Sequence, residues 1–307
     1  MAKVVSINIS EKKGTVKKPV EKAVVDEKGI VNDAHAGSWH RQITLLAQER
    51  IDEFSQEIGR QVQYGEFAEN ITTHGIDLSK GTILDRFKIG RVELEVTQKG
   101  KKCHGDACAI YREVGKCVMP KEGIFCRVLN GGEIVVGDAL EYYPRSLRIA
   151  VITVSDRASR GEYEDLSGPE IVKKTKEYFK DKPWKLNIHT VIIPDDAETL
   201  KHEIKLLTNG FDIIFTTGGT GVGSRDITPE VVEPLLDKSI PGIMEYIRVK
   251  YGAKAPNALL SRSVAGIINK SLIYALPGSV KAVREYTDEI LKTVEHSVFM
   301  LKDINTH

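Results

Sequence analysis

The sequence has little cysteine, almost no net charge and no long apolar run near its start. Its four cysteines all lie between Cys103 and Cys126, unlike the dispersed disulfide framework of a secreted domain. The 44 Lys and Arg residues balance 43 Asp and Glu residues, so the composition favours neither a nucleic acid nor a membrane surface as partner. The short apolar run at residues 4–9 is followed by charged residues and matches neither a signal peptide nor a spanning helix. We therefore expect a cytoplasmic protein with reduced thiols that acts on a small charged molecule.

Two patterns divide the 307 residues near residue 145. Short β-rich segments separated by glycine turns run to about Tyr143, interrupted by one helical interval that ends at Gly59. This pattern predicts a mostly-β barrel over residues 1–145. From residue 146 the order becomes strand, loop, helix, repeatedly. That order predicts an α/β domain over residues 146–307, with an open, mostly parallel sheet and helices on both faces.

The predicted strands of the second domain are followed by polar, glycine-rich loops. The strands cover residues 149–154, 186–193, 211–217 and 271–276. Ligands of open α/β sheets bind beyond the carboxyl ends of the strands, so these loops should converge on an active site. The loops contain Ser155-Asp156-Arg157, Pro194-Asp195-Asp196, Thr217-Gly218-Gly219-Thr220-Gly221 and Pro277-Gly278-Ser279.

The glycine-rich segment from Thr217 to Gly223 has the composition of a phosphate-binding loop. Its glycines let main-chain N–H groups approach an anion, and its threonines add hydroxyl donors. It is neither a P-loop nor the dinucleotide fingerprint. A tight turn after a strand is the alternative interpretation. Thr228-Pro229-Glu230 then predicts a helix start, with Thr228 as its N-cap.

Asp226 follows the glycine-rich segment, where a carboxylate would repel phosphate unless a divalent cation lies between them. Asp226 is therefore predicted to be a magnesium ligand. Asp195 or Asp196 could supply a second carboxylate, since magnesium commonly uses one or two carboxylates plus phosphate oxygens. Helix capping is the alternative, and it suits Asp196 better than Asp195.

From residue 148 to about 304 the sequence resembles the molybdopterin adenylyltransferase family. The motifs that carry the resemblance occur in family order: Ser155-Asp156-Arg157-Ala158-Ser159, Ile193-Pro194-Asp195, residues 216–221, Arg225-Asp226-Ile227-Thr228-Pro229-Glu230, Pro241-Gly242, Leu260-Ser261-Arg262 and Leu276-Pro277-Gly278. Two relatives share this fold, the molybdenum-insertion domain and a competence-damage domain. The residues of the two motifs at 217–221 and 225–230 match the adenylyltransferase better than either relative.

The resemblance implies magnesium-dependent transfer of AMP from ATP to the terminal phosphate of molybdopterin, with release of pyrophosphate. By this match Asp195 and Asp226 would be catalytic, metal-binding aspartates. The residues that would hold nucleotide or pterin are Ser155, Asp156, Thr217, Gly218, Gly219, Thr220, Gly221, Ser261, Pro277 and Gly278. It also implies a homotrimer assembled through this domain and a molybdenum-insertion enzyme as partner.

Cys103 lies among Lys99, Lys101, Lys102 and His104, whose positive charge would lower a thiol pKa and favour the reactive thiolate. Sulfur transfer or metal contact would suit that environment. The cysteines lack any paired C-x-x-C spacing, so a zinc or iron–sulfur site is only weakly indicated. For Cys117 and Cys126, a buried, inert thiol is the better interpretation.

Residues 1 to about 143 resemble the MOSC domain, the module found at the C-terminus of molybdenum cofactor sulfurases. The motifs are residues 29–35, 65–73, Lys102-Cys103, Gly131-Gly132-Glu133 and Gly137-Asp138. Cys103 falls where that family places its cysteine, although Lys99-Gly100-Lys101-Lys102 departs from the usual Pro-Arg. The resemblance implies a β-barrel that binds the molybdenum cofactor or handles its sulfur. His35, His40, Arg41 and Lys102 could hold an anionic pterin phosphate, or be solvated surface charges.

The sequence therefore predicts a two-domain enzyme of molybdenum cofactor biosynthesis. The alternative is a carrier or scaffold that binds molybdopterin and nucleotide without turnover.

Overall fold

The computed structural model describes residues 1–101, 111 and 117–304. Contacts divide the chain into two compact units, one comprising Met1–Arg145 and the other beginning at Ser146. Within the described residues, no helix has both the length and the apolar character needed to cross a membrane. Each unit has its own hydrophobic core.

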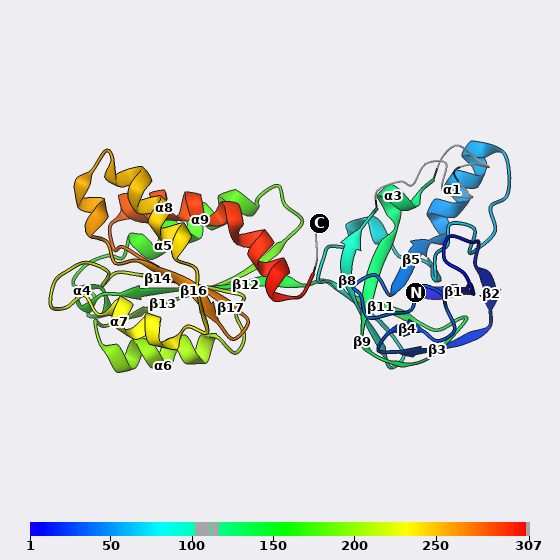
Figure 1. Ribbon diagram of the computed structural model, residues 1–307, viewed down its shortest axis with the longest axis horizontal. Helices are drawn as coiled ribbons and strands as arrows, with labels where there is room; N and C mark the ends of the chain where they lie inside the picture. Colours follow the sequence, from blue (N-terminus) through cyan, green and yellow to red (C-terminus); the bar gives the residue numbers. More distant parts are fainter. Residues whose placement is uncertain (102–110, 112–116, 305–307) are drawn as a thin grey trace. The chain divides into compact units, whose positions relative to one another are not determined.

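The N-terminal unit is mostly β (Figure 1). Its strands are β1 (Lys3–Ile9), β2 (Lys18–Val20), β3 (Lys22–Asp26), β4 (Gly29–Ile30), β5 (Ile43–Ala47), β6 (Ile71–His74), β7 (Arg86–Ile89), β8 (Val92–Lys99), β9 (Ile124–Asn130), β10 (Gly132–Val135) and β11 (Leu140–Tyr143). Its helices are α1 (Gln48–Ile58), η1 (Leu78–Lys80) and α3 (Met119–Glu122). Gly59 ends α1 in the left-handed conformation, with φ of 66°, as its sequence position indicates.

Two sheets make up this unit, an eight-stranded sheet in the order β11-β7-β8-β9-β5-β6-β1-β2 and a three-stranded sheet β10-β3-β4. The expected closed barrel is not confirmed, because no ladder of the described strands joins the two ends of the larger sheet. A single bridge, Lys3 to Ala139, and the hydrogen bond from Leu140 N to Ala2 O connect β1 with the residues around β11. Apolar side chains between the sheets, such as Val4, Leu45 and Leu94, form the core.

The C-terminal unit contains a six-stranded mixed sheet in the order β13-β12-β14-β17-β16-β15. Its strands are β12 (Ser146–Val154), β13 (Lys185–Ile193), β14 (Ile213–Thr217), β15 (Lys238–Ser239), β16 (Val264–Ile268) and β17 (Ser271–Leu276). Its helices are α4 (Asp156–Ser159), α5 (Ser167–Phe179), α6 (Ala197–Leu207), α7 (Thr228–Val232), η3 (Glu233–Leu235), α8 (Pro241–Gly252), η4 (Pro256–Leu260) and α9 (Val280–Leu301).

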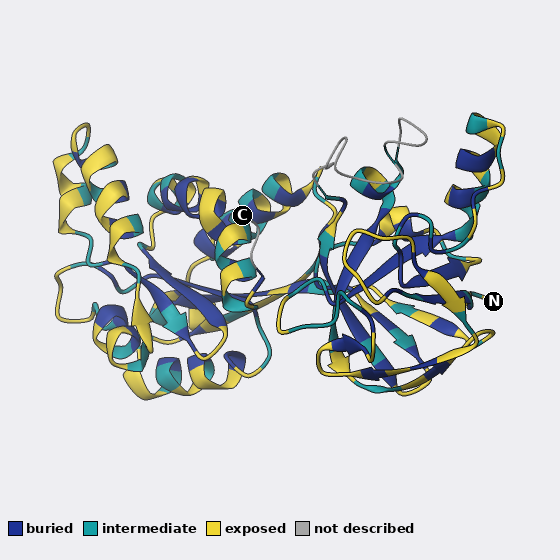
Figure 2. Ribbon diagram, turned by 45° about the vertical axis from the view of Figure 1, so that its right-hand side comes forward, coloured by how far each residue is buried: buried dark blue, intermediate teal, exposed yellow. Residues whose placement is uncertain are grey.

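Helices cover both faces of this sheet, with α5, α8 and α9 on one face and α6 and α7 on the other (Figure 1). The central strands β14 and β17 are buried along their whole length, as their continuous apolar sequences require (Figure 2). Strands β13, β12, β14 and β17 run parallel, as predicted. The sequence did not reveal β16, which pairs antiparallel with β17 and makes the sheet mixed.

Candidate active site at the sheet edge

Four parallel strands end together at one edge of the C-terminal sheet. Val154 pairs with Ile193, and Thr217 pairs with both Thr153 and Leu276, so the loops that follow begin at the same level. Hydrogen bonds join these loops at their first residues, from Ser155 N to Ile193 O and from Gly218 N to Leu276 O. The loops around Asp156, Asp195, Gly218 and Gly278 therefore converge, as the strand pattern predicts.

Glycine is required in the loop after β14 because the backbone turns sharply against its neighbours. Gly218 has φ of 106°, and a Cβ there would lie 2.3 Å from Val154 O. Gly219 has φ of 62°, and a Cβ there would lie 2.6 Å from the Thr228 hydroxyl. A Cβ on Gly278 would approach Gly218 Cα to 3.3 Å, so the two loops pack backbone against backbone.

Thr228 anchors this loop rather than capping the helix after it. The prediction of Thr228 as N-cap was wrong, because Ile227 precedes the first helical residue and Thr228 itself is that residue. Its hydroxyl is buried and donates to Gly218 O at 2.8 Å, while its N–H donates to Gly219 O at 2.9 Å. The carbonyls of the turn thus point into the protein, and the N–H groups of Gly219, Thr220 and Gly221 make no hydrogen bond within the described residues.

Thr217 joins two of the loops. It is fully buried, and its hydroxyl donates to Pro277 O at 2.9 Å. Its hydroxyl proton is therefore already bonded within the protein. Thr220 is also buried, and its carbonyl accepts from Arg262 N at 2.9 Å. Both threonines shape the loop through contacts with neighbouring segments.

Asp195 lies beside Asp156 at the ends of β13 and β12. The carboxylate of each accepts a hydrogen bond from the main-chain N–H of the other, both at 3.1 Å. Strand β12 separates β13 from β14, so Asp156 stands between the strand ends that lead to Asp195 and Asp226. No hydrogen bond or ion pair within the described residues joins Asp195 to Asp226.

Asp196 caps helix α6. Its carboxylate accepts from Thr199 N at 2.8 Å and from the Thr199 hydroxyl at 2.6 Å. These hydrogen bonds lower the pKa of Asp196. Of the two adjacent aspartates, Asp196 is thus the helix cap and Asp195 faces the neighbouring loop.

Asp226 folds back onto the glycine loop. Its Oδ2 accepts from Gly223 N at 2.8 Å, and a Cβ on Gly221 would lie only 2.7 Å from that oxygen. The Asp226 N–H donates to Gly223 O at 3.0 Å, which closes a tight turn. Both Gly221 and Gly223 therefore allow the carboxylate to lie against the loop.

Arg262 was absent from the predicted set of site residues, although it follows Ser261 in the quoted motif. Its Nε donates to Gly221 O at 2.6 Å and its Nη2 to Asp226 O at 2.7 Å. Its Nη1 pairs with Glu230, an interaction that lowers the pKa of Glu230. Ser261 itself shares a 2.7 Å hydroxyl–hydroxyl hydrogen bond with Ser263, and Arg248 donates to the carbonyls of both serines.

The three aspartates suit a hard divalent cation. Oδ1 of Asp195, Oδ1 of Asp226 and Oδ2 of Asp156 accept no hydrogen bond within the described residues. Magnesium prefers such oxygen ligands and is usually bound by one or two carboxylates plus substrate phosphates. The described residues contain no group of three or more His, Cys, Asp or Glu side chains placed to hold a metal ion. The three aspartates therefore do not form a metal site by themselves within the described residues.

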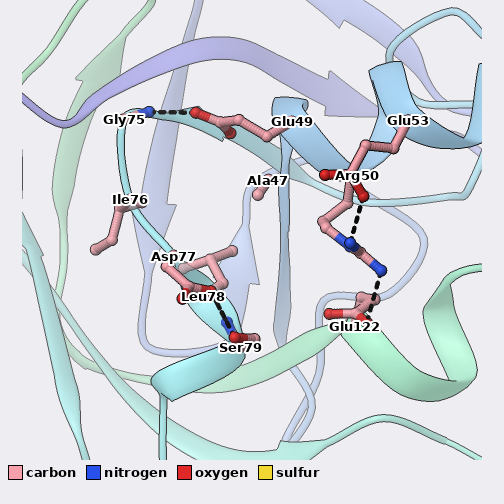
Figure 3. Close-up of a pocket in the computed structure, with 10 residues that line it drawn as sticks. All are labelled: Ala47, Glu49, Arg50, Glu53, Gly75, Ile76, Asp77, Leu78, Ser79 and Glu122. Carbon is pink, nitrogen blue, oxygen red and sulfur yellow. Dashed lines mark hydrogen bonds and ion pairs between the residues drawn. The ribbon is translucent and has the colours of Figure 1, made fainter.

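The described residues also form cavities away from this sheet edge, two of which are large. In the C-terminal unit, a cavity of about 750 Å³ between α5 and β13 is lined by residues such as Asp165, Val172 and Ile192. In the N-terminal unit, a cavity of about 590 Å³ is lined by α1, residues 75–79 and Glu122 (Figure 3). There Arg50 bridges Glu53 and Glu122, and Glu49 accepts from Gly75 N at 2.7 Å. Neither cavity is lined by the glycine loop.

The N-terminal unit buries an ion pair of Lys17 and Asp33, with the half-buried His35 beside it. Lys17 Nζ pairs with Asp33, both side chains are fully buried, and the same ammonium lies 3.1 Å from His35 Nδ1. Burial lowers the pKa of Lys17, although Asp33 opposes that effect. Burial would raise the pKa of Asp33, but hydrogen bonds from His35 and Lys17 outweigh it and hold that pKa well below its usual range.

Trp39 and Arg41 lie next to these residues. Trp39 Nε1 donates to His35 O at 2.8 Å, and the Arg41 guanidinium lies 4.9 Å from the Trp39 ring centre. Burial, together with Arg41 and Arg127, lowers the pKa of His40. The structure thus connects His35 and Arg41 through Trp39, and places Arg41 close enough to affect His40. Lys102 lies outside the described residues.

Cys103 also lies outside the described residues. Cys126 is fully buried in the core of the larger sheet, where burial and Glu95 raise the pKa of its thiol far above the usual range. Cys117 is half-buried. Complete burial agrees with the interpretation of Cys126 as an inert core residue.

Comparisons with known proteins match the two units separately. A family model described as "Probable molybdopterin binding domain" matches residues 150–296, and the MOSC domain model matches residues 32–141. The molybdopterin adenylyltransferase of Helicobacter pylori is 37% identical over 159 residues, which cover 51% of this chain and 89% of that protein. The Pyrococcus furiosus molybdopterin adenylyltransferase is 36% identical over 159 residues, covering 50% and 90%.

Gephyrin of Dictyostelium discoideum is 40% identical over 160 residues, which cover 50% of this chain and 22% of gephyrin. These matches confirm both resemblances that the sequence motifs carry. The chain therefore belongs, through its C-terminal half, to the family of molybdopterin adenylyltransferases, and a MOSC domain precedes that half.

Proposed function

We propose that the C-terminal unit transfers AMP from ATP to the terminal phosphate of molybdopterin in a magnesium-dependent reaction. An oxygen of the molybdopterin phosphate attacks the α-phosphorus of ATP. The bond from that phosphorus to the oxygen bridging it to the β-phosphorus breaks, and pyrophosphate leaves. The observation that carries the proposal is the convergence of a glycine loop and three aspartates at one sheet edge, in a chain half 37% identical to a protein named molybdopterin adenylyltransferase.

The glycine loop would hold the triphosphate of ATP. The N–H groups of Gly219, Thr220 and Gly221 are the available donors, since Gly218 N already donates to Leu276 O. Gly218 and Gly278 would instead permit the close approach of the two loops, with Thr217 and Pro277 fixing their spacing. Transfer of this kind depends on in-line positioning and charge neutralisation, so it needs no covalent nucleophile.

Asp195 and Asp226 would hold the magnesium ion, with Asp156 between them. A bound magnesium ion would neutralise phosphate charge during the transfer. Asp156 keeps Asp195 in place through their reciprocal hydrogen bonds. To bind a cation with both oxygens, the Asp226 carboxylate would give up its hydrogen bond to Gly223 N. Ser155 and Ser261 would line the pterin side of the site.

The N-terminal unit would bind the molybdenum cofactor or handle its sulfur. The MOSC match over residues 32–141 supports this role, and Cys103 would be the sulfur-bearing or cofactor-contacting residue. Arg41 would contribute positive charge to an anionic pterin, and His35 and His40 would contribute hydrogen-bond donors. The adenylylated product would pass to a molybdenum-insertion enzyme, and a homotrimer formed through the C-terminal unit is the expected assembly.

The test is incubation of the purified full chain with molybdopterin, magnesium and ATP, followed by measurement of pyrophosphate release and of the pterin product mass. The matched variants are Asp226→Asn and Asp195→Asn, with Asp288→Asn as a surface control whose carboxylate pairs with Lys174. We expect an AMP adduct with the wild-type chain and the control, and little with the other two. Binding of both ligands without any adduct would instead favour a carrier or scaffold.

A further inference from the structure

Arg262 contacts both ends of the segment that carries the glycine loop and Asp226. Its main-chain N–H donates to Thr220 O at 2.9 Å, and its Nε donates to Gly221 O at 2.6 Å. On the far side of the turn, its Nη2 donates to Asp226 O at 2.7 Å. One side chain therefore joins Gly221 to Asp226, near the two ends of the segment 220–226.

Glu230 completes this arrangement from helix α7. Its carboxylate pairs with Arg262 Nη1, and this ion pair lowers the pKa of Glu230. The guanidinium thus directs its three nitrogens at two carbonyls and one carboxylate of its own chain. Because Glu230 offsets the positive charge, the group is poorly suited to bind a phosphate itself. Its geometry suits it to hold the loop in shape.

We propose that Arg262 is a positioning residue, which fixes residues 220–226 in the conformation that presents the loop N–H groups and the Asp226 carboxylate to a magnesium–triphosphate ligand. This inference rests on the proposed function of the same site. The planar guanidinium offers donors in a fixed fork, whereas a lysine ammonium is a point charge on a flexible stem. A lysine at position 262 would keep the charge but could not bridge Gly221 O, Asp226 O and Glu230 together.

The charge-preserving variant Arg262→Lys therefore separates positioning from direct electrostatic action. If Arg262 acted through its charge on the phosphates, lysine would preserve most of the affinity for nucleotide. If it positions the loop, lysine should behave like the uncharged variant Arg262→Met. Arg284→Ala is the matched control, because Arg284 also pairs with a glutamate, Glu170, but contacts helix α5 rather than the loop.

The first measurement is hydrogen exchange of the full chain without ligand, followed by mass spectrometry of the peptide that contains residues 220–226. The amides of Gly223 and Asp226 are bonded inside this turn, so their exchange reports its conformation. We expect roughly tenfold faster exchange in Arg262→Lys and Arg262→Met, and none of this change in Arg284→Ala. Exchange equal to wild type in both Arg262 variants would overturn the proposal.

The second measurement is calorimetric binding of a non-hydrolysable ATP analogue with magnesium. We expect the affinity to fall about tenfold in Arg262→Lys and in Arg262→Met. Wild-type affinity in the lysine variant, with loss only in the methionine variant, would show that Arg262 acts through its charge and would overturn the positioning role.

If either variant fails to fold, Glu230→Gln provides the same test. We expect exchange at residues 220–226 to increase in this variant, by less than in the Arg262 variants. Unchanged exchange would contradict the proposal.

These readouts are separate from the proposed reaction. A wild-type chain that binds the magnesium–nucleotide analogue but forms no AMP adduct would refute the adenylyl transfer. The exchange and affinity of the Arg262 variants would still decide whether the residue positions the loop.

Discussion

The charged groups singled out in the two units lie in opposite environments. The N-terminal unit buries the side chains of Lys17, Asp33 and Glu69, and Lys17 and Asp33 form an ion pair there. The C-terminal unit keeps Asp156, Asp195 and Asp226 at the end of a sheet, in loops or at the start of helix α4, each with an oxygen left without a hydrogen bond within the described residues. Removing a buried charge should therefore mainly change stability, and removing a loop carboxylate should mainly change activity.

The largest expected effect is on the buried pair. Lys17→Met leaves the Asp33 carboxylate buried without its ammonium, which should lower the free energy of unfolding by about 3–5 kcal/mol. Urea unfolding measures this loss. The double variant Lys17→Met/Asp33→Asn removes both charges and should recover part of it. A single variant as stable as wild type would mean that the pair is not buried in solution.

The C-terminal carboxylate gives the contrasting result. Asp226→Asn should slow AMP transfer by roughly 100- to 1,000-fold, a loss typical of removing one electrostatic group from a transfer site. Its midpoint of thermal unfolding should change little, because the carboxylate keeps only one hydrogen bond, from Gly223 N. A large loss of stability with an unchanged rate would reverse the comparison between the units.

Glu69 adds a pH dependence to the N-terminal unit. Burial raises the pKa of Glu69 to about 7, and one of its carboxylate oxygens is buried without a partner in the described residues. The folded state therefore binds the proton more tightly than the unfolded state, and the stabilising contribution is complete below pH 4.5 and lost as the pH rises to 7. The stability of wild type relative to Glu69→Gln should fall by about 3 kcal/mol from pH 4 to pH 8. Urea unfolding at a series of pH values tests this, and a difference independent of pH would contradict it.

The smallest expected effects come from replacing one glycine in each unit, Gly59 and Gly218. Gly59 ends helix α1 with φ of 66° and has open space where a Cβ would lie, so Gly59→Ala should cost only about 1 kcal/mol of stability. Gly218 has a strained φ as well, and a Cβ there would also collide with Val154 O. Gly218→Ala should therefore cost more stability than Gly59→Ala and weaken binding of magnesium–ATP. Equal effects in thermal unfolding and calorimetry would argue against the tight packing of the loop.

The sequence predicted the part of the site that depends on local pattern. The apolar runs at residues 149–154 and 271–276 and the glycines after Thr217 were sufficient to locate the strand ends and their loops. Strand β16 escaped prediction because the short run Val264–Ile268 does not distinguish a strand from a buried helix segment. Its antiparallel direction depends on pairing with β17, which no local pattern encodes.

The contacts between distant segments could not be predicted either. The order of the strands places β12 between β13 and β14, and this order brings Asp156 against Asp195. Arg262 contacts the loop at Asp226, which lies 36 residues earlier in the sequence. Lys17 lies in a lysine-rich stretch, a composition typical of a solvated surface. It is nevertheless buried, because it forms an ion pair with Asp33 from a separate segment of the chain.

The most direct test of the account follows the phosphorus atoms of ATP through the reaction. The full chain is incubated with magnesium, molybdopterin and ATP labelled with ³²P at either the α or the γ position, and the pterin product is isolated. The account predicts that label from the α position enters the pterin, that label from the γ position leaves in pyrophosphate, and that Asp226→Asn transfers little of the α label and releases little labelled pyrophosphate. Label from the γ position in the pterin, or no label from either position, would contradict adenylyl transfer at this sheet edge.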